Sequence, residues 1–220
     1  MIQPLRHLSA FDRTLTQVDR VVRTLAPGGK PRVAGRPRPQ PESGIAEHPL
    51  SEADSRTSAA LMRVNHSGEV CAQALYQGQA LGARSARVRE GLEEAAGEEV
   101  DHLAWCEARL NELDGRTSVL NPLWYGLSFG LGAGAGLISD KVSLGFVAAT
   151  EELVAAHLES HLQRLPAGDS RSRAIVHAML DDERRHGETA LAAGGESLPR
   201  PVKRLMKTVA NGMTKSSYYL

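Results

Sequence analysis

The chain is poor in cysteine. It has only two, Cys71 and Cys106, and their positions follow no spacing pattern. The sequence therefore does not indicate a disulfide framework, and a reducing compartment suits the chain. The first residues contain no continuous apolar stretch of the kind that opens a secretory signal, so no such signal is expected.

The chain also has no net charge, because 26 Lys and Arg balance 26 Asp and Glu. This balance gives no reason to expect nucleic acid as a partner. The charges are unevenly distributed, however, and both ends are basic. Residues 1–41 carry eight basic and two acidic side chains, residues 200–220 carry five basic and none acidic, and the body between has a net charge of −11. An acidic body favours cation ligation, and basic ends suit an anionic surface such as a membrane.

What the chain does contain is two Glu-x-x-His pairs, Glu99 with His102 and Glu183 with His186. Residues three apart lie on the same face of a helix, so each pair directs one carboxylate and one imidazole toward the same point. A single pair is weak evidence, because surface helices are rich in both residue types. Two facing pairs, with one Glu from each of two further helices, form the di-iron carboxylate site of ferritin-like bundles.

Two further glutamates lie at the right distance to complete such a site. Glu69 lies 30 residues before Glu99, and Glu151 lies 32 residues before the second pair. If the partners sit at one height on antiparallel helices, the turns must fall halfway along these intervals. The halfway segments read Gly-Ala-Arg-Ser (82–85) and Pro-Ala-Gly-Asp (166–169), which are typical turn sequences. The sequence therefore predicts two helical hairpins, each offering Glu and then Glu-x-x-His.

These hairpins predict an all-α fold, a ferritin-like four-helix bundle over residues 51–195. Capping and helix-breaking residues place its helices at about residues 51–81, 87–113, 140–165 and 169–193. Residues 115–139 would form the long crossover that such a bundle needs between its second and third helices.

The crossover is the least polar part of the chain. Residues 117–139 include no charged side chain over 23 positions. By length this stretch could cross a bilayer, but Asn121-Pro122 and five glycines argue against a clean spanning helix. Either the crossover packs on the bundle or it enters a membrane interface, and the sequence leaves both possibilities open.

Amphipathic segments are predicted on both sides of the bundle. Residues 1–25 place apolar side chains three and four positions apart, at Leu8, Phe11, Leu15, Val18, Val22 and Leu25. A Pro/Gly-rich linker, residues 26–50, follows. In the basic C-terminal segment, residues 196–220, the apolar stripe consists of Val202, Leu205, Met206, Val209 and Met213. Such helices either dock on the bundle or lie on a membrane surface.

Neighbours of the six residues raise further expectations. Glu151 and Glu152 are adjacent, so only one can point fully inward, and spacing alone does not choose between them. Asp182 and Glu98 each precede a ligand glutamate, so they are candidates to accept N–H groups from His102 and His186 respectively.

Some nearby side chains are expected to stay outside the ligand set. His66 lies on the face of Glu69 and would support the site or lie near substrate. His157 and His161 share a face that Glu151 does not, which indicates polar-face or pocket-edge positions. Small residues near Glu151, such as Ala148 and Ala155, would leave room for a planar ring.

Four carboxylates and two imidazoles suit iron or manganese better than zinc, which favours a closed tetrahedral set. Six protein ligands shared by two metals also leave coordination positions open, as oxygen chemistry requires. Metal, rather than a surface cluster of charges, is therefore the interpretation that the six spaced residues favour.

Five segments resemble the demethoxyubiquinone hydroxylase family. They are Arg-Val-Asn-His-Ser-Gly-Glu-Val (63–70), Leu-Tyr-Gln-Gly-Gln (75–79), Glu-Val-Asp-His-Leu (99–103), Thr-Glu-Glu-Leu (150–153) and Asp-Glu-Arg-Arg-His (182–186). The resemblance covers about residues 55–190 and is in register at all six ligand positions. It implies that Glu151 is the ligand, that Glu99 and Glu183 bridge two irons, and that Glu69 and Glu151 are terminal. Cys71 departs from the small residue expected there.

The resemblance implies a monooxygenase of ubiquinone biosynthesis with two iron ions per chain. Its substrates would be O2 and a 3-methyl-6-methoxy-2-polyprenyl-1,4-benzoquinol, whose ring is hydroxylated. It further implies a peripheral position on the cytoplasmic side of a bacterial inner membrane and membership of a ubiquinone-biosynthesis protein complex. Two alternatives use the same bundle: a ferroxidase or iron-handling protein, and a non-catalytic lipid-binding assembly subunit. The uncharged crossover and the basic C-terminal stripe count against the ferroxidase.

Overall fold

The computed structural model describes residues 10–26, 40–46 and 48–220. The start of the predicted N-terminal helix and most of the predicted linker lie outside these residues. The described part is all-α, as predicted, and contains no strand. Its helices are α1 (Ala10–Leu25), α2 (Glu52–Gly82), α3 (Ala86–Glu112), α4 (Asn121–Ile138), α5 (Asp140–Arg164), α6 (Ser170–Ala192) and α7 (Arg200–Tyr219).

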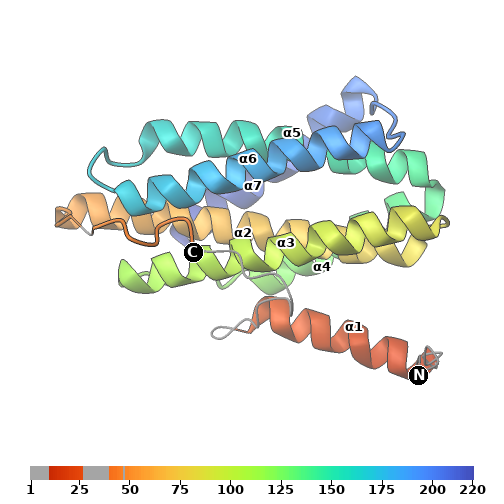
Figure 1. Cartoon of the computed structure of the whole chain (residues 1–220), viewed down its shortest axis with the longest axis horizontal. Coiled ribbons are helices and arrows are strands. Elements are labelled where there is room, and N and C mark those ends of the chain that lie inside the picture. The colour runs from red at the N-terminus through yellow and green to blue at the C-terminus, as the bar shows by residue number, and fades with distance from the viewer. Residues whose placement is uncertain (1–9, 27–39, 47) are drawn as a thin grey trace.

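The four long helices form two hairpins that pack face to face. Figure 1 shows α5 and α6 as one layer above the layer of α2 and α3, with α4 and α7 behind them and α1 below. The turns between paired helices occupy residues 83–85 and 165–169. Both overlap the halfway segments that the ligand spacing predicts, so the two-hairpin prediction is confirmed.

Local chemistry explains where the bundle helices begin and end. The Ser51 hydroxyl accepts from the Asp54 amide at 3.1 Å, and Asp169 caps α6 by accepting from the Ser172 amide at 2.9 Å. Each cap satisfies an amide that has no partner within its own helix. Beyond α3 and α6, Asp114 and Gly194 adopt left-handed backbone conformations with φ of 52° and 102°. This conformation ends a helix and turns the chain away.

The crossover is itself a helix, α4, which runs along α2. The helix continues through its five glycines. Pro122 lies in the first turn, where its missing N–H is tolerated, and Gly132 and Gly136 pack against the backbone of α2. Gly78 and Gly82 of α2 face the backbone of α4, and a Cβ at Gly136 would lie 2.7 Å from the Gln79 carbonyl oxygen. The two backbones therefore meet closely enough to exclude larger residues. Among the described helices, none is both long and apolar enough to cross a membrane.

The flanking helices each use part of their apolar surface to dock. On α1, Val21 and Leu25 pack against a buried cluster that includes Val70 and Tyr125, whereas Leu15 and Val18 stay exposed. The C-terminal helix α7 is longer than the predicted stripe and packs against α2 and α5. The docking alternative therefore holds for part of each helix, and an apolar remainder faces outward.

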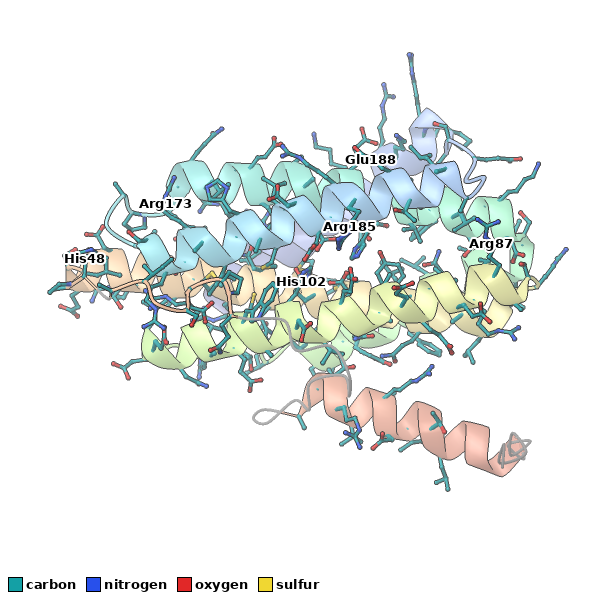
Figure 2. All side chains as sticks on the ribbon, viewed as in Figure 1. His48, Arg87, His102, Arg173, Arg185 and Glu188 are labelled. Atoms are coloured by element: carbon teal, nitrogen blue, oxygen red, sulfur yellow. The ribbon has the colours of Figure 1, made fainter. Side chains whose placement is uncertain are left out.

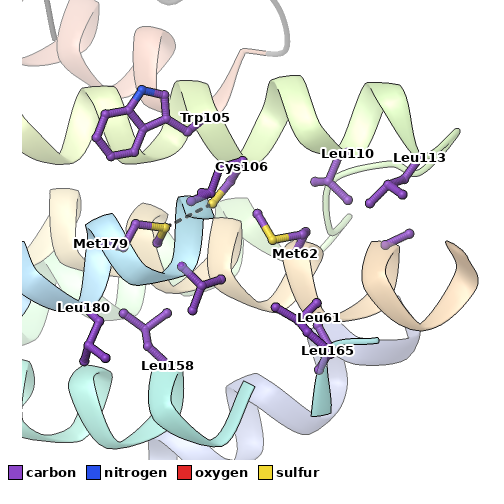
Figure 3. Packing of buried hydrophobic residues seen from close by; sticks show 13 residues of the cluster. Leu61, Met62, Trp105, Cys106, Leu110, Leu113, Leu158, Leu165, Met179 and Leu180 are labelled. Carbon is purple, nitrogen blue, oxygen red and sulfur yellow. Dashed lines mark hydrogen bonds between the residues drawn. The ribbon is translucent and has the colours of Figure 1, made fainter. Parts of the chain in front are cut away.

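The buried apolar side chains fall into two main clusters along the bundle. One contains Met62, Trp105, Cys106, Leu158 and Met179, drawn in Figure 3. The other contains Tyr76, Leu92, Leu144, Val147 and Ala190. On every long helix the predicted ligand positions lie between the residues of the two clusters. The polar centre is thus enclosed between two apolar layers.

Candidate metal centre

All six predicted ligands are buried in the middle of the bundle. Each of the four long helices contributes, because a Glu or a Glu-x-x-His pair occupies the inward face at the same height. Within the described residues, two groups could hold a metal ion: Glu69, Glu99, His102 and Glu183 in one, and Glu151, Glu183 and His186 in the other. Potential ligand atoms in each group lie within 4.8 Å of one another. Glu183 belongs to both groups, so the two candidate positions are adjacent.

Two glutamates face both histidines at once. Glu99 places Oε2 3.0 Å from His102 Nδ1 and Oε1 3.4 Å from His186 Nδ1. Glu183 places Oε1 3.2 Å from His102 Nδ1 and Oε2 3.7 Å from His186 Nδ1. Glu69 lies beside His102 alone, at 3.4 Å. This geometry agrees with the bridging roles implied for Glu99 and Glu183, which stay a prediction.

The hydrogen bonds of the described residues leave several metal-ligating atoms of this cluster unused. Six buried atoms make no hydrogen bond with any described residue: Glu69 Oε2, Glu99 Oε1, Glu151 Oε2, both carboxylate oxygens of Glu183, and His186 Nδ1. Buried polar atoms without a partner are costly in a folded protein. A cluster of carboxylate oxygens and an imidazole nitrogen, all pointing to one place, fits metal ions as the missing partner.

The far nitrogens of both histidines are held by carboxylates, as predicted. His102 donates from Nε2 to Asp182 at 2.9 Å, and His186 donates from Nε2 to Glu98 at 2.7 Å. Each supporting carboxylate immediately precedes a ligand glutamate on the opposite Glu-x-x-His helix. Because Nε2 is engaged in this way, Nδ1 is the nitrogen left to face the metal positions.

Glu151 has a further partner that the sequence reasoning did not identify. The Tyr76 hydroxyl donates to Glu151 Oε1 at 2.5 Å, and both side chains are buried. Tyr76 lies two turns after Glu69 on α2, so helical spacing alone could have placed it near the site. The adjacent Glu152 is exposed and pairs with Lys203 at 2.6 Å. The structure therefore directs Glu151, rather than Glu152, into the bundle.

The electrostatics of the cluster divide the glutamates into two kinds. Burial and the nearby charges of Glu99 and Glu183 raise the pKa of Glu69 and of Glu151 well above the usual value. Burial also opposes ionisation of Glu99, but the charge and hydrogen bond of His102 outweigh it and lower its pKa well below the usual value. Burial and the charge of Glu99 oppose ionisation of Glu183, but its contacts with both histidines outweigh them and lower its pKa.

The histidines respond in the opposite sense. Burial alone would lower their pKa values, but contacts with Glu99 and Glu183 raise that of His102 well above normal and that of His186 to about 11. Without metal, the cluster is therefore stabilised by protons on its histidines. Metal ions would replace those protons as the positive charges of the site.

The histidines outside the ligand set occupy different places. His66 is buried and accepts from the Asn121 amide at 3.3 Å. His157 lines a cleft, as expected for a pocket-edge residue. The polar-face expectation is wrong for His161, which is 1% exposed and donates from Nδ1 to Asn65 Oδ1 at 2.7 Å. Asn65 on α2 supplies a buried partner that the spacing of α5 alone does not reveal.

An apolar cleft of 310 Å³ reaches the centre from one side. It lies between α2, α4, α5 and α7, and its wall includes Glu69, Leu75, Leu131, Phe146 and Leu205. Ala148 and Ala155 do line a hollow beside Glu151, as expected, but Glu159, Arg184 and Lys203 line it too. The route suited to an apolar molecule therefore leads to Glu69 rather than to the Ala148 side of Glu151.

Comparisons with known proteins identify the family of the chain. The family described as "Ubiquinone biosynthesis protein COQ7" matches residues 56–217. The chain belongs to the COQ7 family. This COQ7-family chain is 58% identical over 214 residues to the "3-demethoxyubiquinol 3-hydroxylase" of Azotobacter vinelandii, and 56% identical over 214 residues to that of Stutzerimonas stutzeri. Each alignment covers 97% of both chains. Membership confirms the ferritin-like fold and the family resemblance, whereas the six ligand positions stay a prediction.

Proposed function

We propose that this COQ7-family chain binds two iron ions and hydroxylates the ring of a 3-methyl-6-methoxy-2-polyprenyl-1,4-benzoquinol in ubiquinone biosynthesis. The observation that carries the proposal is the set of six unused donor atoms on Glu69, Glu99, Glu151, Glu183 and His186. The names of its relatives describe a hydroxylase of this substrate class, and nearly full-length similarity supports extending that activity to this chain.

Each residue has a defined part in this proposal. Glu69 and His102 would hold one ion and Glu151 and His186 the other, while Glu99 and Glu183 would bind both. Bound ferrous iron would supply the activation of O2, with one oxygen atom entering the ring and the other leaving as water at the expense of a reductant. Asp182 and Glu98 keep the histidine rings oriented, and Tyr76 fixes the Glu151 carboxylate.

The apolar cleft supports the choice of substrate. A polyprenyl tail resists leaving lipid by about 0.8 kcal/mol for each methylene group, so it needs an apolar path to the centre. Side chains of α4 and α7, including Leu127, Leu131, Met206 and Val209, provide that path down to Glu69. The cleft also excludes bulk water from the reacting ring. A ferroxidase would have no need of such a cleft.

We further propose that the chain binds the cytoplasmic surface of a bacterial inner membrane through α4 and α7. Leu131 is 52% exposed and Leu205 is 65% exposed, and both also line the cleft. The basic residues of α7 would add a salt-sensitive attraction to anionic lipid. Assembly with other proteins of the pathway stays a prediction.

Vesicle flotation tests this membrane surface. Leu131→Asp combined with Leu205→Asp should abolish flotation with vesicles that contain anionic lipid. Leu191→Asp is the matched control, because Leu191 on α6 is 52% exposed but lies outside the cleft. Unchanged flotation of the double variant would show that these leucines serve only packing.

The quinone profile of a strain that lacks the protein tests the activity. The strain should accumulate the demethoxy intermediate, and the wild-type chain should restore ubiquinone. Glu152→Ala should restore it as well, because Glu152 points away from the centre, whereas Glu183→Ala should not. A normal quinone profile in the deletion strain would support the iron-handling alternative instead.

A further inference from the structure

An arginine joins the two halves of the candidate centre from outside. Arg185, on α6 between Glu183 and His186, donates from one guanidinium nitrogen, Nη2, to Glu98 Oε2 at 2.7 Å and to Asp182 Oδ1 at 2.7 Å. These are the two carboxylates that orient the ligand histidines. Figure 2 shows Arg185 and His102 at mid-length of the bundle, on the facing helices α6 and α3.

The arrangement forms a continuous chain of hydrogen bonds. It runs from His102 through Asp182 to Arg185, and from Arg185 through Glu98 to His186. The carboxylates are largely buried, with side chains 8% and 13% exposed, whereas the Arg185 side chain is 51% exposed. Arg185 also lines a hollow of 720 Å³ between α3 and α6, whose wall includes His186 and Tyr76. The cation therefore lies between the two carboxylates on a solvent-facing side of the centre.

We propose that Arg185 is a positioning residue that couples the two histidines of the metal centre by holding both of their supporting carboxylates. The hydrogen bonds of its guanidinium group go to Glu98 and Asp182, which are not among the six predicted metal ligands. It acts by fixing Glu98 and Asp182, and through them the direction in which each imidazole presents Nδ1. One residue thereby sets the geometry of both metal positions. The inference rests on the proposed function, because it presumes that the six buried residues bind iron.

The competing explanation is an ordinary exposed ion pair that contributes little. A change at the neighbouring Arg184 distinguishes this explanation from the positioning role. Arg184 lies one position earlier on the same helix, its side chain is 52% exposed, and it pairs with Glu159 at 2.5 Å. Glu159 supports neither histidine. Arg184→Met therefore removes an equivalent surface ion pair without touching the carboxylates of the centre, and it is the matched control for Arg185→Met.

Ferrous iron affinity, measured anaerobically by competition with a chelator, tests the proposal. Arg185→Met should weaken binding about 10-fold, as loss of a residue that supports metal ligands commonly does. Arg184→Met should stay within about twofold of wild type. Arg185→Lys should fall between, because an ammonium group lacks the fixed planar fork of arginine. Mössbauer spectra of the oxidised Arg185→Met protein should show changes at both iron positions.

Wild-type affinity in Arg185→Met, or an equal loss in Arg184→Met, would overturn the coupling role. Melting temperatures of the metal-free proteins provide a check on folding, and both variants should lie within about 4 °C of wild type. If Arg185→Met does not fold, Arg185→Lys decides, and wild-type affinity in that variant would contradict the proposal. A wild-type chain that binds no iron would overturn the proposed function and this inference together. Two irons in wild type with no effect at Arg185 would overturn the inference alone.

Discussion

The α2–α3 and α5–α6 hairpins supply the same ligand pattern but surround it differently. In the first, Glu69 borders an apolar cleft and its Oε2 makes no hydrogen bond with any described residue. In the second, Glu151 accepts a hydrogen bond from Tyr76 and borders a hollow with charged side chains in its wall. The repeat makes the ligand pattern nearly symmetric, but the surroundings of the two hairpins differ. We call the cleft beside Glu69 the substrate side, and the part of the centre where Tyr76 holds Glu151 the anchored side.

The helices that cover the hairpins account for this difference. The glycine-lined contact lets α4 lie directly on α2, and α7 packs across α2 and α5. The cleft forms where these helices meet beside Glu69. Neither α4 nor α7 contributes a ligand, yet together they determine which side of the centre an apolar molecule can reach.

Removing a ligand that belongs to both metal groups should have the largest effect on iron binding. Glu183→Ala takes a carboxylate from both candidate metal groups, so we expect iron binding to weaken by at least about 100-fold at both positions. Glu152→Ala, next to the ligand Glu151 of the same hairpin but paired outward with Lys203, should retain both irons. Metal analysis after anaerobic reconstitution measures the stoichiometry. Two irons per chain in Glu183→Ala would contradict the shared role.

The contact between α2 and α4 can be broken at a glycine. A side chain at Gly132 would collide with the backbone of Leu75, so Gly132→Val should lower the free energy of unfolding by about 3 kcal/mol. Gly134, two residues on in the same helix, has open space around it, and Gly134→Ala should be neutral or stabilising by up to about 1 kcal/mol. Urea denaturation compares them, and equal stability of the two variants would show that the glycines do not determine the packing.

The anchored side can be probed at Tyr76. Tyr76→Phe removes the hydroxyl that holds Glu151, and we expect about 10-fold weaker binding of one iron and little change in the other. Tyr125→Phe removes a hydrogen bond to Gln77 away from the ligands and serves as the control. Stepwise ferrous titration resolves the two affinities. An equal change at both positions would mean that Tyr76 does not distinguish the hairpins.

A smaller effect concerns the buried His161 of the second hairpin. Burial, and after it the nearby charges of His157 and Arg164, lower the pKa of His161 to about 2 from its ordinary value of 6.5. The unfolded chain therefore binds a proton that the folded chain does not. The stability that neutral His161 allows is complete above pH 6.5 and is lost as the pH falls from there toward 2, by about 1.4 kcal/mol for each pH unit.

Replacing this histidine should make stability less sensitive to acid. His161→Gln keeps an amide donor for Asn65 but does not titrate, so its free energy of unfolding should fall less steeply between pH 6.5 and 5. Urea denaturation of the metal-free proteins at several pH values measures the two slopes. The same slope in wild type and variant would show that His161 is protonated in the folded protein.

Much of the site could be predicted from the sequence because its signal is local. A helix fixes the direction of residues three apart, and the interval between ligands places each turn at its midpoint. That reasoning placed the turns at residues 82–85 and 166–169, which overlap the observed turns after Gly82 and Arg164, and it anticipated the support of His102 by Asp182. The choice of Glu151 over Glu152 needed the family resemblance, because adjacent residues differ only by a rotation that spacing does not fix.

The remaining features depend on packing between distant segments. The glycines of the crossover counted against a clean spanning helix, but the sequence did not show that Gly132 and Gly136 permit a close contact with α2. The spacing along α5 indicated a polar-face or pocket-edge position for His161. Its buried hydrogen bond to Asn65 comes from another helix, α2, and is not visible in that spacing. The hydrogen bonds of Arg185 to both Glu98 and Asp182 likewise require α3 and α6 to lie side by side. The contacts between different helices have no periodic signal along one segment, and of those named here only Arg185 with Asp182 lies within one helix, three residues apart.

Oxygen labelling of the product tests the central claim most directly. Purified iron-loaded protein, a chemical reductant and a short-tailed 6-methoxy quinol would be allowed to react under isotopically labelled O2. The account predicts a ring-hydroxylated quinol that carries one labelled atom, and no product from Glu183→Ala. A hydroxyl oxygen derived from water, or rapid oxidation of ferrous iron without any hydroxylated quinol, would contradict it.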